Sequence, residues 1–108
     1  MAIDITQQDG TLMLIGTINF ATVNQWRERT EQILTAKAYR DYCIDFSQVV
    51  QADSSILTLM LCLLRLAKAL GIKVLYVAVP DHVLRISELY GIKSLLPVSN
   101  REDASRNG

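Results

Sequence analysis

Residues 53–71 read DSSILTLMLCLLRLAKALG, and the rest of the chain is organised around this stretch. Its start, Asp53-Ser54-Ser55, offers side-chain oxygens that can cap a helix, and Gly71 is the residue expected just after a helix C-terminus. Between these ends, apolar residues recur at three- and four-residue steps. The pattern predicts a helix with a broad apolar face that packs on a sheet.

A helical projection places a polar face opposite the packing face. Leu61 falls within this polar face and Leu57 lies at its border, one turn earlier. A single exposed leucine needs no function, because folded proteins expose much apolar surface. Two adjacent leucines near the helix start can instead form a patch for a partner. We therefore predict a partner-binding surface at this end of the helix, consisting of Asp53, Ser54, Ser55, Leu57, Thr58 and Leu61.

The Asp53-Ser54-Ser55 segment has two interpretations that are compatible with each other. In the first, Asp53 or Ser54 accepts a hydrogen bond from an early helix amide, and its loss costs about 1 kcal/mol. In the second, Ser54 is a phosphoacceptor, because a phosphate at a helix N-terminus lies near free amides and the positive end of the dipole. Such a phosphate would add about two negative charges to the surface that a partner must touch.

The sequence before the helix predicts a hairpin, a helix and a strand. Residues 3–7 and 11–17 form the hairpin around the Asp9-Gly10 turn. Asn19 or Thr22 caps a helix whose apolar stripe includes Trp26. A strand over residues 42–46 follows, and residues 47–52 are expected to be a connecting loop.

The sequence after the helix predicts a strand, a helix and a short edge strand. Residues 72–79 are almost continuously apolar, which is typical of a central strand covered on both faces. A helix runs from Pro80 to Gly91 with Val83, Ile86 and Leu89 or Tyr90 inward, and residues 95–98 form the edge strand. We predict a single α/β domain over residues 1–98. Its mixed sheet has four to five strands, antiparallel in the first hairpin and then parallel, with helices packed on it. A disordered polar tail is expected over residues 99–108.

Composition argues against several classes of function. Lys plus Arg and Asp plus Glu number 11 each, so no strong field should attract nucleic acid or anionic lipid. Cys43 and Cys62 lie inside apolar runs and are expected to be buried thiols, so neither a metal nor a cofactor is predicted. His82, the single histidine, is expected to be solvated. No motif of a nucleotide-binding or hydrolytic enzyme is present, and the apolar runs are too short for membrane insertion.

Three segments make the chain resemble the STAS family, which includes bacterial anti-sigma factor antagonists and domains attached to sulphate transporters. Gly16-Thr17-Ile18-Asn19 with Thr22 is similar to the family's Gly-Glu-Leu-Asp run and its following Thr. Asp45-Phe46-Ser47-Gln48-Val49 followed by Asp53-Ser54-Ser55 resembles the family's strand and Asp-Ser-Ser helix start. Leu89-Tyr90-Gly91-Ile92 with Leu95-Leu96-Pro97-Val98 is similar to its closing segment.

Within the family, the resemblance most closely matches the STAS subunit of the bacterial phospholipid-trafficking ABC transporter that maintains outer-membrane lipid asymmetry. The Leu-x-x-Leu-Ala-Lys run at residues 63–68 and the Leu-Tyr-Gly-Ile ending carry this match. It implies a non-catalytic cytoplasmic protein, held at the inner membrane by an ATPase subunit and, through it, a permease, with contact at the start of the helix.

The alternative that the resemblance implies is an anti-sigma factor antagonist regulated by phosphorylation of Ser54. Ile56 stands where the family usually has Gly, and this favours constitutive docking over a phosphorylation switch.

Overall fold

The computed structural model describes residues 3–99, so the tail predicted over residues 99–108 lies outside them except for Ser99. Four strands form one sheet in the order β1-β2-β3-β4. Strands β1 (Asp4–Gln8) and β2 (Thr11–Ile18) are antiparallel, whereas β3 (Asp41–Ala52) is parallel to β2, and β4 (Lys73–Val77) is parallel to β3. This mixed sheet confirms the predicted α/β class.

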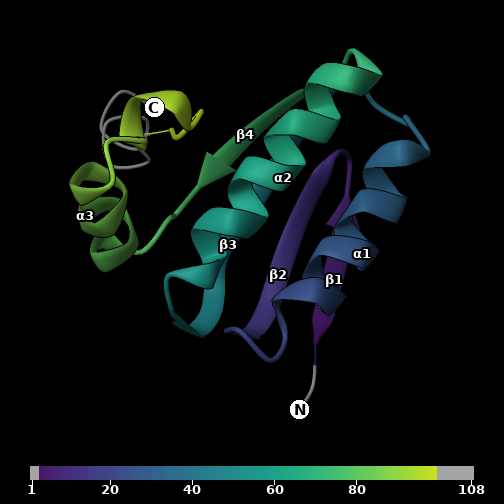
Figure 1. Ribbon diagram of the computed structural model, residues 1–108. Helices are drawn as coiled ribbons and strands as arrows, with labels where there is room; N and C mark the ends of the chain where they lie inside the picture. Colours follow the sequence, from purple (N-terminus) through teal and green to yellow (C-terminus); the bar gives the residue numbers. More distant parts are fainter. Residues whose placement is uncertain (1–2, 100–108) are drawn as a thin grey trace, which may run out of the picture.

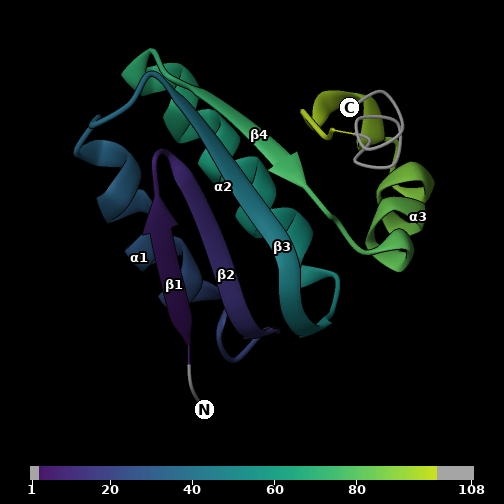
Figure 2. The ribbon, with the colours of Figure 1, turned by 180° about the vertical axis from the view of Figure 1, so that it is seen from behind.

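Helices α1 (Val23–Thr35) and α2 (Ser55–Leu70) lie side by side on one face of the sheet (Figure 1). The opposite face carries no helix within residues 3–99, as the view from behind shows (Figure 2). Helix α3 (Asp81–Leu89) lies beyond β4 and is followed by the short 3₁₀ helix η1 (Lys93–Leu95). Parallel strands require crossover helices, and α1 and α2 are those crossovers.

Local sequence explains the turns that connect these elements. Asp9 and Gly10 both have positive φ, 50° and 84°, as a two-residue hairpin turn requires. Gly71 has φ 72° and ends α2, with its N–H bonded to the carbonyls of Ala67 and Lys68. Both positions adopt the conformations that the sequence predicts for them.

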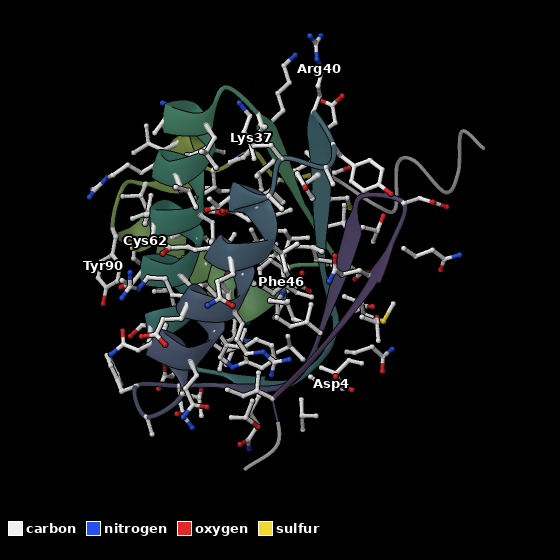
Figure 3. All side chains as sticks on the ribbon, turned by 90° about the vertical axis from the view of Figure 1, so that its right-hand side faces the viewer. Asp4, Lys37, Arg40, Phe46, Cys62 and Tyr90 are labelled. Carbon is white, nitrogen blue, oxygen red and sulfur yellow. The ribbon has the colours of Figure 1, made fainter. Side chains whose placement is uncertain are left out.

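The core lies between the sheet and the two helices. Side-chain packing there includes Phe46, which points from β3 toward the helices (Figure 3). Trp26 is fully buried, and its Nε1–H donates to the Thr17 carbonyl at 2.9 Å. Tyr76 is also fully buried and donates to the Met60 carbonyl. Burial, with a smaller contribution from Cys62, raises the pKa of the Tyr76 phenol.

Two predictions about the strands are wrong. Residues 47–52 are not a connecting loop. Strand β3 continues to Ala52, because this segment pairs with β2 as far as Ile18. Two register shifts along this pairing allow the polar segment to stay in the ladder. Strand β4 is not central, because it lies at the edge of the sheet and Leu75 is 42% exposed.

The C-terminal elements also differ from the prediction. Val83 is buried and Ile86 is half-buried, as expected, but Leu89 and Tyr90 are exposed and Ser87 is buried in their place. The predicted edge strand at residues 95–98 is reduced to one parallel bridge between Val98 and Tyr76. Pro97 has no N–H to continue a ladder, which is consistent with this short pairing.

Candidate functional site

The candidate site is the start of α2, where the Asp53 carboxylate connects the first turn of the helix to the loop between β2 and α1. Its Oδ1 accepts hydrogen bonds from the Ser55 N–H, at 2.8 Å, and from the Ser55 hydroxyl. Its Oδ2 accepts from the Phe20 N–H, at 3.3 Å, in the loop between β2 and α1. Asp53 therefore performs the capping predicted for Asp53 or Ser54, and it also fixes the neighbouring loop.

These hydrogen bonds lower the pKa of Asp53. Desolvation by partial burial raises the pKa of its carboxyl. The hydrogen bonds donated by Ser55 and Phe20 act in the opposite direction and outweigh it, so the pKa of Asp53 lies below its ordinary value of 3.8. The carboxylate is consequently ionised at neutral pH.

Ser54 differs from both of its neighbours. Ser55 is buried, at 2% exposure, whereas Ser54 is half-buried and makes no capping hydrogen bond through its side chain. Within residues 3–99 no hydrogen bond engages the Ser54 hydroxyl. Its oxygen is thus the one hydroxyl of the Ser54-Ser55 pair that can be modified without breaking a recorded contact.

The amides near Ser54 are not free, contrary to expectation. The Ser55 N–H is bonded to the Asp53 carboxylate, the Ile56 N–H to the Asp53 carbonyl, and the Leu57 N–H to the Ser54 carbonyl. A phosphate on Ser54 would lie beside an ionised carboxylate and would find these donors occupied. These three amides therefore do not offer it the stabilisation that uncapped helix amides provide.

The predicted leucine patch is wrong. Leu57 is only 4% exposed, because the flank of α2 that carries it is covered. Leu57 belongs to the same buried cluster as Val83 of α3, and α3 lies beside α2 on the side opposite α1. Leu61 is half-buried and packs against the same core. Thr58, which was also predicted to face outward, is exposed.

Two exposed apolar side chains beside Asp53 were not predicted. Phe20 is 74% exposed in the loop that Asp53 holds, and Val50 is 77% exposed near the end of β3. Val50 and Asp53 line a common hollow of about 410 Å³, together with His82. We call Phe20, Val50, Ser54 and Thr58 the docking surface.

The sequence carried weak signals for these two residues. Phe20 is a lone aromatic residue directly after the Asn19 turn, and Val50 lies in a segment that reads as a loop. The Asn19 side chain accepts from the Ala21 and Thr22 N–H groups at 2.8 and 3.0 Å, which shapes this turn before α1. These signals do not by themselves distinguish an exposed side chain from a buried one.

His82 and Ile56 also affect this end of the molecule. The His82 side chain is exposed, and its Nε2–H donates to the Ala52 carbonyl at 2.8 Å, which links the start of α3 to the end of β3. Ile56 is completely buried in the core. Its side chain therefore contributes nothing to the surface around Ser54, and its position gives no reason to prefer constitutive docking over a phosphorylation switch.

The STAS domain family model matches residues 2–105, nearly the whole chain. The chain belongs to the STAS domain family. A search of curated proteins found no match. In the described part of this STAS domain, no group of acidic, histidine and cysteine side chains could hold a metal ion. The helices found there are all too short or too polar to cross a bilayer.

Solved structures support the same fold. The anti-sigma factor antagonist SpoIIAA in its unphosphorylated form is 17% identical, with a TM-score of 0.69 and coverage of 98% of this chain and 95% of that chain. The Bacillus cell fate determinant SpoIIAA in the phosphorylated form is 16% identical, with a TM-score of 0.65 and coverage of 98% of this chain and 98% of that chain. An anti-sigma factor antagonist from Mycobacterium paratuberculosis is 21% identical, with a TM-score of 0.66 and coverage of 98% of this chain and 92% of that chain. At these identities the likeness establishes the fold.

Proposed function

We propose that this STAS domain is a non-catalytic binding module of the anti-sigma factor antagonist type, with Ser54 as its phosphoacceptor. The observation that carries the proposal is the half-buried Ser54 hydroxyl, which has no hydrogen-bond partner in residues 3–99, between two residues that are fully engaged. Modification of Ser54 therefore leaves the cap intact. The solved SpoIIAA structures, one unphosphorylated and one phosphorylated, support a phosphorylated state for this type of protein.

The geometry indicates how a phosphate would act. Because the early amides of α2 are occupied, a phosphoryl group on Ser54 stays in solvent beside the Asp53 carboxylate. It adds about two negative charges next to the exposed Phe20 and Val50 side chains. A partner that buries those side chains must then desolvate the charges, which weakens binding. The switch works through the surface and leaves the fold unchanged.

Affinity purification from the native host tests this proposal. We expect a soluble protein kinase that binds the wild-type chain, and phosphate on Ser54 in mass spectra. Ser54→Arg should abolish the interaction while changing the free energy of unfolding by less than about 1 kcal/mol, the scale of a lost cap. Ser94→Arg, at an exposed serine of η1, is the matched control and should bind normally.

Unchanged binding by Ser54→Arg would contradict the role of the helix start. Phosphate found only on other residues would contradict the phosphoacceptor role. Turnover by the purified protein on a panel of esters, phosphates and nucleotides would contradict its non-catalytic character.

A second candidate is an accessory subunit that binds the ATPase of a phospholipid-transport ABC complex. Two observations favour it: the Leu-x-x-Leu-Ala-Lys run at residues 63–68, and the exposed Phe20 and Val50, which suit a permanent contact. In this case the protein lies in the cytoplasm at the inner membrane, held there by its partner. Membrane-extracted ATPase and permease subunits would co-purify with it, and binding would not depend on phosphate.

A further inference from the structure

The outer edge of β4 is only partly paired. Along β4, alternate residues direct their backbone groups away from β3. Tyr76 is such a residue, since its N–H donates to the Pro97 carbonyl at 2.9 Å and its carbonyl accepts from the Ser99 N–H at 2.9 Å. Val74, two residues earlier, has the same outward orientation, and none of residues 3–99 pairs with it across this edge.

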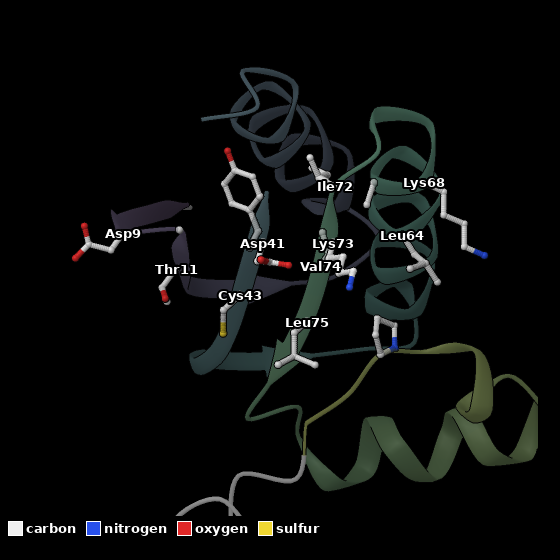
Figure 4. Close-up of a pocket in the computed structure, with 14 residues that line it drawn as sticks. Asp9, Thr11, Asp41, Cys43, Leu64, Lys68, Ile72, Lys73, Val74 and Leu75 are labelled. Atoms are coloured by element: carbon white, nitrogen blue, oxygen red, sulfur yellow. The ribbon is translucent and has the colours of Figure 1, made fainter. Parts of the chain in front are cut away.

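An apolar groove runs along this free part of the strand. It has a volume of about 640 Å³ and extends from the C-terminal half of α2, past the β4 edge, across the start of β3 to the turn between β1 and β2 (Figure 4). Leu64 and Ala67 of α2 and Pro97 line it on the side of the helices. Leu75 and Cys43 line it on the open face of the sheet. An added strand would therefore find apolar contacts for side chains on both of its faces.

One end of the groove is cationic. Lys73 lines both the groove and an adjoining hollow of about 490 Å³, which Lys37 and Arg40 also line. Lys68 lines the groove from α2. None of these four side chains forms an ion pair within the described residues, although Asp41 borders both cavities. The cations surround the N-terminal end of β4, and Lys37 and Arg40 project outward together (Figure 3).

We propose that the β4 edge binds an extended segment of a partner protein, with alternating apolar residues followed by acidic residues. The segment pairs with the Val74 backbone, places apolar side chains beside Leu64 and over Leu75, and directs its acidic end toward Lys73. Addition of a strand to an exposed sheet edge is a common mode of peptide recognition. This site is separate from the docking surface and lies at the opposite end of α2 from Ser54.

Other occupants fit this edge less well. In a twofold pairing of two β4 strands centred on Val74, the Pro97–Ser99 segment of each copy would occupy the edge that the other copy needs. Residues 100–108 of this chain contain a single apolar residue, Ala104, so they cannot fill an apolar groove.

Fluorescence anisotropy with a labelled peptide of sequence Thr-Val-Thr-Ile-Thr-Val-Glu-Glu tests the proposal. We expect the full chain to bind it, and N-methylation of alternate peptide amides to weaken binding by roughly tenfold in one register only, because only that register loses a hydrogen bond. Lys73→Glu should weaken binding by a similar factor, and a peptide ending in Lys-Lys should restore it. Arg85→Glu, at an exposed arginine of α3, is the control and should bind like the wild type.

Nuclear magnetic resonance on the same complex locates the peptide. We expect the hydrogen of the Val74 amide to exchange more slowly when the peptide is bound. The Ser54→Arg variant should bind the peptide with the same affinity as the wild type, so this test is independent of the test of the docking surface. The proposal is overturned if no peptide binds at about 1 mM. It is also overturned if N-methylation has no effect, if the chain dimerises through β4, or if deletion of residues 100–108 is needed for binding.

Discussion

The Asp53 side chain connects the start of α2 to the loop that carries Phe20. Its two carboxylate oxygens accept three hydrogen bonds, two from Ser55 and one from Phe20. The first pair fixes the start of α2, and the third holds the loop that presents Phe20. With Asp53 and Ser55 engaged, Ser54 is left with an available hydroxyl. The proposed modification of Ser54 rests on this difference between three consecutive residues.

Replacement of Asp53 separates its charge from its shape. Asp53→Ala removes the cap and the tether of Phe20 and should lower the free energy of unfolding by about 1 kcal/mol at neutral pH. Asp53→Asn keeps the acceptor for Ser55 and should cost less. Urea denaturation of the three proteins measures both effects. Equal stability of Asp53→Ala and wild type would contradict the capping role.

The pH dependence of this difference follows from the lowered pKa of Asp53. A carboxyl whose pKa is lower in the folded state than in the unfolded state stabilises the fold above its ordinary pKa of 3.8. This contribution is lost as the pH falls through the folded pKa. The stability difference between wild type and Asp53→Asn should therefore be constant near neutrality and shrink below about pH 4.

Among the elements, the sequence predicted α2 and its ends best, because caps and helical periodicity are local signals. It failed for Leu57, since burial of a helix flank depends on whether another helix lies beside it, and α3 does. It failed for the length of β3, since the polar segment near Val50 stays extended through pairing with β2. The candidate site at Ser54 stays a prediction, and the sequence did not predict the exposure of Phe20 and Val50 because that exposure depends on tertiary structure.

The two leucines that were expected to form one patch should respond differently to truncation. Leu57→Ala removes a buried side chain and leaves a cavity, so it should cost about 2–5 kcal/mol of unfolding free energy. Leu61 is half-buried, and Leu61→Ala should cost clearly less. Chemical denaturation of both variants makes the comparison. A loss of unfolding free energy below about 0.5 kcal/mol for Leu57→Ala would contradict the burial of Leu57.

At the scale of the molecule, we expect the segment of α3 and η1 to be held less strongly than the layer formed by the sheet, α1 and α2. Strands β2 and β3 pair over most of their lengths, and α1 and α2 pack on each other above them. Helix α3 and η1 lie outside this layer, next to the edge strand, and their connections include the His82–Ala52 hydrogen bond and the Val98–Tyr76 bridge. Stability is not uniform within a domain, and regions with few buried contacts open first.

We therefore expect the segment from Asp81 to Leu95 to exchange its amide hydrogens through local opening, at a lower free energy than the amides of β2 and β3. His82→Ala removes the link to Ala52 and should speed exchange in α3 while leaving exchange in β2 unchanged. Native-state hydrogen exchange measured by mass spectrometry resolves both segments. Uniform exchange across the chain would mean that α3 unfolds only with the sheet, and the packing of Leu57 and Val83 would then be the stronger connection.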